Sequence, residues 1–234
     1  MPVKICYHGT AFVGNYLYIF GGYNGDAMNN AGISIAFRLS ISTKVWEKLP
    51  DLFQRRLYIA GASSNTGTVL AIGGNTDKSE HEHKSYINDS GRCKIVEEYL
   101  PERQVWRRLP DMLEHRSDAS AVCTKNFIFV AGGFNGDHCL RSVEVYDYDN
   151  HQWFFIDSLV SPRSGLCLLS YQDHLLAIGG FGGNKNTRHH SFECLSVEKF
   201  RQSSWKKHPA KLETGRSNFG ATVINNFEIG IRII

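Results

Sequence analysis

The sequence predicts an all-β protein built from one repeated unit, and three observations lead to this fold class. Four Gly-Gly pairs each end a short apolar run, each of the four tryptophans follows one pair, and an arginine comes 10 or 11 residues after each tryptophan. Landmarks that recur in one order, with 47 to 60 residues between successive arginines, indicate an internal repeat. The landmarks are Gly21-Gly22, Trp46 and Arg56; Gly73-Gly74, Trp106 and Arg116; Gly132-Gly133, Trp153 and Arg163; Gly179-Gly180, Trp205 and Arg216.

The composition agrees with many short strands joined by tight turns. The 234 residues include 22 glycines but only 6 prolines, and 12% are aromatic. The net charge of +3 is too small to indicate a nucleic-acid or anionic-membrane partner. No apolar run reaches the length of a membrane-spanning helix, and the first residues have no long apolar stretch, so a secretory signal is not expected.

Each unit contains four segments with strand character. The first follows the arginine, as in ASAVCT (119–124), GLCLLS (165–170) and FGATVI (219–224), and the second runs into the glycine pair. The third alternates, as in VEEY (96–99), VEVY (143–146) and VEKF (197–200), which predicts a strand with one more exposed face. The fourth opens at the tryptophan.

Four strands per unit, repeated radially, predict the blades of a β-propeller. The glycine pair allows the second strand to bend where blades crowd together. The tryptophan and the aromatic residue seven positions before it are expected to pack between blades, because each blade must stack on its neighbours. Tyr99 with Trp106 and Tyr146 with Trp153 are the two clear pairs.

The pattern of Gly-Gly, an aromatic residue, six residues and Trp resembles the kelch repeat, over roughly residues 7–228. Within kelch proteins, RSDASA (116–121), GGFNGDHCL (132–140), RSG (163–165) and RSNFG (216–220) resemble the kelch-like (BTB-BACK-kelch) family. The resemblance implies a kelch-type propeller that captures a substrate protein for ubiquitination, next to a BTB domain that binds cullin-3.

The repeat divides the chain into expected units 7–55, 56–115, 116–162 and 163–215, followed by an incomplete unit 216–234. A fifth glycine pair is expected near 232–233, where Arg232 and Ile233 stand instead. We therefore expect a partial propeller of four full blades and the start of a fifth. BTB and BACK domains are expected to be absent from these residues.

Binding is expected on loops, because strands of a propeller serve as scaffold. One loop set precedes each first strand and the other follows each glycine pair, and the resemblance implies that both face a substrate peptide. A guanidinium group binds carboxylates, which favours an acidic or polar segment as the partner. The expected partner-binding residues are Tyr23, Asn24, Arg116, Ser117, Phe134, Asn135, Arg163, Ser164, Phe181, Arg216 and Ser217.

A structural role for the repeated arginine is the open alternative, in which it binds backbone carbonyls between blades. A position filled in all four units is the kind that a fold requires. In the first unit Leu57 stands where serine is expected, which puts Arg56 in doubt as a binding residue.

Neither a metal nor a cofactor is expected. Glu80, His81, Glu82 and His83 fall in an insertion that is expected to be a solvated polar loop, and His189-His190 is interpreted in the same way. Nucleophile, base and orienting residue do not come together in the sequence, so no enzymatic activity is expected, and a kelch-fold enzyme is the remote alternative.

The function predicted from the sequence is protein interaction of the ubiquitin-adaptor type, with actin or cytoskeletal binding as the alternative. The six cysteines include no C-x-x-C pair and are expected to be reduced thiols of a cytoplasmic protein. Cullin-3 would be bound only through a BTB domain, and neither nucleic acid nor membrane is an expected partner.

Overall fold

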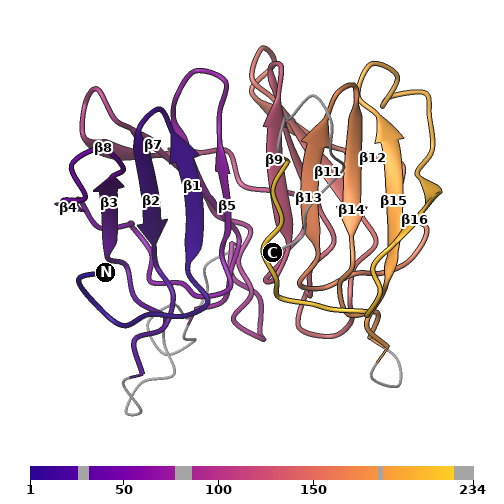
Figure 1. Cartoon of the computed structure of the whole chain (residues 1–234), viewed down its shortest axis with the longest axis horizontal. Coiled ribbons are helices and arrows are strands. Elements are labelled where there is room, and N and C mark those ends of the chain that lie inside the picture. Colours follow the sequence, from indigo (N-terminus) through magenta and orange to yellow (C-terminus); the bar gives the residue numbers. More distant parts are fainter. Residues whose placement is uncertain (26–31, 77–85, 184–186, 224–234) are drawn as a thin grey trace.

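The computed structural model describes residues 1–25, 32–76, 86–183 and 187–223, and all regular elements within them are β-strands (Figure 1). The strands form four antiparallel sheets, each made of four strands that are consecutive in the sequence. The all-β prediction is confirmed.

The bounds of the strands follow the repeat. The first sheet contains β1 (Gly9–Val13), β2 (Tyr16–Phe20), β3 (Ala36–Ser40) and β4 (Trp46–Leu49). The second contains β5 (Ala60–Ser63), β6 (Val69–Ile72), β7 (Val96–Leu100) and β8 (Val105–Leu109). The third contains β9 (Ser120–Thr124), β10 (Phe127–Ala131), β11 (Val143–Asp147) and β12 (Gln152–Ile156). The fourth contains β13 (Cys167–Tyr171), β14 (His174–Ile178), β15 (Ser191–Ser196) and β16 (Lys206–Lys211).

The four sheets are the blades of a β-propeller. The first strands of neighbouring blades pack against one another in the order β1, β5, β9 and β13. These inner strands surround a central cavity of about 660 Å³. The prediction of a propeller with four blades is therefore confirmed, and residues 216–223 continue past the fourth blade without forming a strand.

Three of the four tryptophans, Trp106, Trp153 and Trp205, pack their blade against the blade before it. Trp106 in the second blade packs in one cluster with Phe20 of the first, and its indole Nε1 donates a hydrogen bond of 2.9 Å to the carbonyl of Pro50. Trp153 repeats the arrangement one blade later, with a hydrogen bond of 2.8 Å to the carbonyl of Pro110. The rings of Tyr99 and Trp106 lie 5.3 Å apart, and those of Tyr146 and Trp153 lie 5.2 Å apart. Trp205 is buried, whereas Trp46 is half-buried.

Three local predictions are corrected. The third strand of the fourth blade is β15, and VEKF (197–200) forms the bend and turn that follow it. FGATVI was expected as a strand, but its described residues, 219–223, do not form one. Finally, β11 is buried on both faces and β7 nearly so. The third strand lies inside a blade that is packed between two others, so its alternating polar residues face the interior and not solvent.

A chain of backbone hydrogen bonds links the blades at the end where the glycine pairs lie, the lower end in Figure 1. The residue two positions after each arginine has a left-handed backbone with φ between 54° and 64°, and its N–H donates to the carbonyl of the equivalent residue in the preceding blade. The distances are 2.8 to 3.1 Å. This left-handed arc consists of Tyr7, Tyr58, Asp118, Gly165 and Asn218.

The glycine pair is required by close contact between blades. Gly132 has φ +62°, and a Cβ atom there would lie 2.3 Å from the carbonyl oxygen of Arg163 in the next blade. The N–H of Gly133 donates to that same carbonyl at 2.8 Å. A side chain at Gly132 would therefore force the fourth blade away from the third.

Candidate protein-binding site

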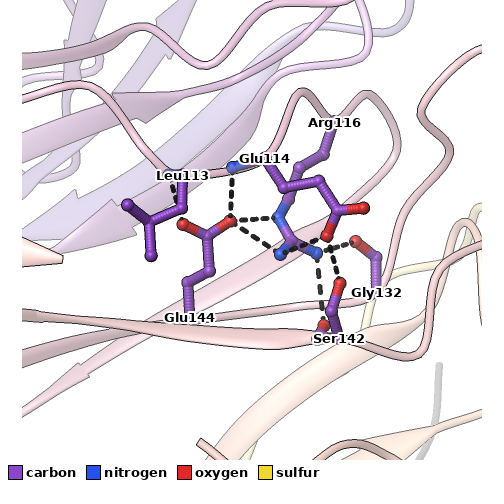
Figure 2. A network of polar contacts seen from close by, with 6 residues as sticks. All are labelled: Leu113, Glu114, Arg116, Gly132, Ser142 and Glu144. Atoms are coloured by element: carbon purple, nitrogen blue, oxygen red, sulfur yellow. Dashed lines mark hydrogen bonds and ion pairs between the residues drawn. The ribbon is translucent and has the colours of Figure 1, made fainter. Parts of the chain in front are cut away.

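The repeated arginine is buried and holds its own blade together. Arg116 donates to one carboxylate oxygen of Glu144 from Nε at 2.9 Å and from Nη2 at 2.7 Å (Figure 2). Its Nη1 donates to the carbonyl of Gly132 at 2.8 Å and to that of Ser142 at 3.2 Å. The Arg116 and Glu144 side chains have no exposed surface. The arginine therefore connects the second and third strands of its blade at the end where the glycine pair lies.

Glu144 completes the network by ordering the loop before the arginine. Its carboxylate accepts hydrogen bonds from the backbone N–H of Leu113 at 2.5 Å and of Glu114 at 3.2 Å. The carboxylate of Glu114 in turn accepts from Nη2 of Arg116 at 3.1 Å and from the hydroxyl of Ser142. A buried charge is tolerated because it is paired and its remaining hydrogen-bonding capacity is satisfied.

A similar network occurs in the neighbouring blades, although Nε of Arg56, unlike that of Arg116, has no hydrogen-bond partner among the described residues. Arg163 pairs with Glu193 at 2.8 Å and donates to the carbonyl of Gly179 at 2.6 Å. Arg56 pairs with Glu97 at 2.7 Å and donates to the carbonyl of Gly73 at 2.7 Å.

This geometry corrects the expectation that Arg116 and Arg163 contact a partner. Their guanidinium groups are used within the fold, which is the structural alternative left open by the sequence. The same holds for Arg56. Arg216 is exposed.

The two loop sets meet at the same end of the molecule in every blade. The residue after each arginine and the residue after each glycine pair form a two-residue β-bridge, as in Ser117 with Phe134 and Ser164 with Phe181. Cys6 with Tyr23 and Leu57 with Asn75 are the corresponding bridges of the first two blades. These bridges place the aromatic side chains after the glycine pairs beside the left-handed arc.

A pocket of about 700 Å³ opens between these loops. It includes Phe134, Ser164, Phe181 and Ser217 from the sequence prediction, together with Gly182. Tyr23, Asn24, Arg116, Ser117, Asn135, Arg163 and Arg216 are not among its lining residues. Ser117 is buried, and the side chain of Asn135 accepts hydrogen bonds from the backbone of Asp137 and His138, so both are occupied by the fold.

Opposite charges are interspersed in the pocket. Arg92 and Arg188 line it from the second and fourth blades, and Asp118 and Asp137 line it from the third. The Arg92 guanidinium lies 5.0 Å from the ring centre of Phe134. Burial raises the pKa of Asp118 from 3.8 to about 6, and a hydrogen bond from Ser117 and the charge of Arg92 partly oppose this increase. The pocket therefore combines aromatic faces with both signs of charge, which suits a polypeptide segment.

The sequence analysis did not single out Tyr58, Arg92, Asp118, Arg188 or Asn218, although all of them line the pocket. One signal was present for the left-handed arc. The position two residues after the arginine is Asp118, Gly165 or Asn218 in three units, and these residue types tolerate a left-handed backbone. Arg92 and Arg188 lie in loops whose length differs between units, so the repeat does not align them with equivalent positions.

In the part of the chain that the structure describes, no three His, Cys, Asp or Glu side chains form a group that could hold a metal ion. Glu80, His81, Glu82 and His83 lie outside the described residues. His189 hydrogen-bonds to the carbonyl of Pro162 at 3.0 Å. The six cysteines are free thiols, and burial raises the pKa of Cys93 and Cys123 to about 12. The described residues include no helix with the length and apolarity needed to cross a membrane.

Comparison with known proteins gives matches over nearly the whole chain. Residues 7–231 match the KLHDC2/KLHL20/DRC7 Kelch-repeats domain family. The chain is 31% identical over 226 residues to spermatocyte protein spe-26 of Caenorhabditis elegans, covering 94% of this chain and 36% of that protein. It is 26% identical over 222 residues to human (Homo sapiens) kelch-like protein 23, covering 93% and 35% of the two chains.

Kelch-like protein 41b of Danio rerio is 32% identical over 158 residues, which covers 67% of this chain and 24% of that protein. Across these three relatives the chain thus spans between 24% and 36% of the relative's length. Among solved structures, that of YjhT superposes with a TM-score of 0.77 at 17% identity, covering 95% of this chain and 75% of the other. This likeness shows the fold.

Proposed function

Because the chain belongs to the kelch-repeat family, we propose that it is a protein-recognition module whose pocket between the glycine-pair loops binds a polypeptide segment. The observation that carries the proposal is the pocket itself. Loops of three blades contribute to it, and it contains aromatic faces, polar groups and both signs of charge. Loops held by a rigid scaffold are where binding residues concentrate.

The buried arginines change the expected chemistry of the partner. The argument for an acidic segment relied on Arg116 and Arg163, and both are paired inside their blades. The charges that do line the pocket come from two arginines and two aspartates, with His138 beside them. The recognised segment is therefore expected to be polar and of mixed charge, with an apolar side chain between Phe134 and Phe181.

We propose further that the module selects substrates for a cullin-3 ubiquitin ligase. Similarity to kelch-like relatives supports this role. Cullin-3 itself would contact a BTB domain and not the propeller, so this chain is expected to bind the substrate and not cullin-3. The similarity of RSDASA, GGFNGDHCL, RSG and RSNFG to kelch-like protein 10 is a finer assignment that stays a prediction.

Actin binding is the alternative, and sedimentation of the chain with filamentous actin separates the two. Pelleting of the chain with filaments would favour the cytoskeletal role. We propose no catalytic activity, because the pocket residues include no nucleophile activated by a neighbouring base. The free thiols support a cytoplasmic location.

The experiment that tests the proposal is selection of peptides from a random display library by the purified chain. Replacement of Phe134 or Phe181 with alanine should lower the affinity for the selected peptides by about tenfold or more, as expected for a central aromatic contact. Phe155→Ala is the control, because Phe155 is 51% exposed in β12 and does not line the pocket. Equal binding by all three variants would show that the peptides bind elsewhere.

A further inference from the structure

The pocket contains a carboxylate that no cation of the described residues neutralises by direct contact. Asp118 forms no ion pair in the described part of the chain, and its side chain interacts with Ser117 by a hydrogen bond. A carboxylate withdrawn from water without a paired cation is unfavourable, unless a ligand supplies the missing charge.

The groups that face Asp118 are held by other contacts. Arg92 is close enough to affect Asp118 electrostatically, but its guanidinium donates to the carbonyl of Ser90 at 2.7 Å and lies on the ring of Phe134. Arg188 lines the same pocket and donates to the hydroxyl of Ser217 at 3.2 Å. In the described residues neither arginine forms an ion pair with Asp118, and Nε of Arg92 has no hydrogen-bond partner.

The remaining titratable groups nearby do not compensate the charge. Burial is the main cause that raises the pKa of Tyr58 and Cys139, and the negative charge of Asp118 raises both further. At the edge of the pocket, Asp137 and His138 form a pair at 3.1 Å, with side chains that are 92% and 63% exposed. The positive charge of His138, when present, is therefore directed to Asp137.

The fold does not require a charge at this position. Asp118 belongs to the left-handed arc, where its N–H donates to Tyr58 at 3.1 Å and its carbonyl accepts from Gly165 at 2.8 Å. The equivalent residues of the following units are Gly165 and Asn218, which make the same backbone contacts without a carboxylate. The carboxylate is thus an addition to the arc, fixed in place by a rigid backbone.

We propose that Asp118 is the specificity-determining residue of the pocket and selects a polypeptide segment that places a lysine or arginine side chain on its carboxylate. The inference rests on the proposed function and names its substrate class. The apolar stem of such a side chain can lie along Phe134 and Phe181 while its charged end reaches Asp118. A segment with a carboxylate at that point would be repelled.

The test compares the chain with two variants in selection from the random-peptide library. Asp118→Asn should keep the left-handed backbone, because Asn218 adopts the same backbone conformation at the equivalent position of another unit. Asp173→Asn is the control, because it also removes one negative charge but at an exposed turn position that does not line the pocket. The wild-type chain and the Asp173→Asn variant should enrich peptides with a basic residue at one fixed position, and the Asp118→Asn variant should not.

Direct binding of one selected peptide gives the second measurement. Replacing its basic residue with norleucine should weaken binding to the wild-type chain at least about tenfold, and binding to Asp118→Asn less than about twofold. Because the pKa of Asp118 is about 6, its carboxylate is mostly protonated at about pH 5, where the peptide should bind about tenfold more weakly than at about pH 7.5. The difference between wild type and Asp118→Asn separates this effect from that of His138.

The outcomes distinguish this inference from the proposed function. Enriched peptides without a basic residue, or identical enrichment by wild type and Asp118→Asn, would overturn the role of Asp118 and leave peptide binding intact. If neither chain enriches any peptide, the proposed function fails and the inference fails with it.

Discussion

Arg116 and Glu144 form an ion pair with no exposed surface, with 2.7 Å between Nη2 and Oε1. The pair connects the residue that opens a unit to the third strand of the same blade, and Arg56–Glu97 and Arg163–Glu193 repeat it. Each arginine also binds the carbonyl of the glycine that ends the second strand. The repeated arginine and the first glycine of the pair are therefore parts of one buried network.

Removing one member of this pair should destabilise the whole propeller. Glu144→Gln leaves the buried Arg116 guanidinium with only the partly exposed carboxylate of Glu114 as counter-charge, so the free energy of unfolding should fall by about 3–5 kcal/mol. Denaturant unfolding measures the change. Glu47→Gln is the control, because Glu47 pairs with Arg38 at a 48% exposed position and should lose less than about 1 kcal/mol. Equal losses would contradict the structural role of the buried pair.

The glycine pair should be far less tolerant of alanine than another glycine with the same backbone conformation. Gly132→Ala should lower the free energy of unfolding by more than about 3 kcal/mol, because its Cβ would overlap the carbonyl of Arg163. Gly14 has φ +57° and open space around it, so Gly14→Ala should lose only about 1 kcal/mol of conformational strain. Thermal melting of both variants checks this order, and similar melting temperatures would disagree with close contact between the blades.

The tryptophans should contribute unequally to stability. Trp153→Phe removes both the hydrogen bond to Pro110 and part of the contact with the second blade, which should cost about 1–3 kcal/mol. Trp46 is half-buried, so Trp46→Phe should cost less than about 1 kcal/mol. Denaturant unfolding at one pH compares them, and a larger loss at Trp46 would be inconsistent with this packing.

The half-buried carboxylate of Asp118 should make stability depend on pH in a direction opposite to that of a salt-bridged aspartate. The folded chain binds the Asp118 proton more tightly than the unfolded chain, because burial raises its pKa from 3.8 to about 6. Asp118 therefore lowers stability above about pH 6, and this penalty disappears as the pH falls to about 4. Asp118→Asn should be more stable than wild type by about 1–3 kcal/mol at about pH 7.5, with no difference at about pH 4. A gap that is constant with pH would refute the assignment.

The sequence was sufficient to predict the fold class and the four blades, whereas four of the eleven predicted partner-binding residues line the pocket. Local patterns determine these features, because the glycine pair, tryptophan and arginine mark equivalent positions of a repeated unit. The third strand of the fourth blade was placed too late because VEKF alternates as VEVY does, whereas β15 reads SFECLS. Both adjacent segments contain a glutamate, and alternation alone does not show that Glu193 in β15, and not Glu198 in VEKF, is the buried partner of the arginine.

The roles of the arginines could not be settled from the sequence, because their glutamate partners lie 28 to 41 residues away. Arg116 is 28 residues from Glu144, and Arg163 is 30 residues from Glu193, so no local pattern links them. From the sequence, a glutamate in an alternating strand is interpreted as solvent-exposed. Only the position of the neighbouring blade shows that Glu97 and Glu144 are buried. Asp118 was missed for a different reason. The aspartate does not recur at the equivalent positions, which are Gly165 and Asn218, so the repeat did not mark it.

Hydrogen–deuterium exchange of the chain with a selected peptide tests peptide recognition most directly. The bound peptide should slow exchange at 134, 137–139, 181–183 and 217–218, which line the pocket. Slowed exchange confined to the turns at the other end of the blades, such as 125–126 and 172–173, or no change at any site, would contradict recognition by this pocket.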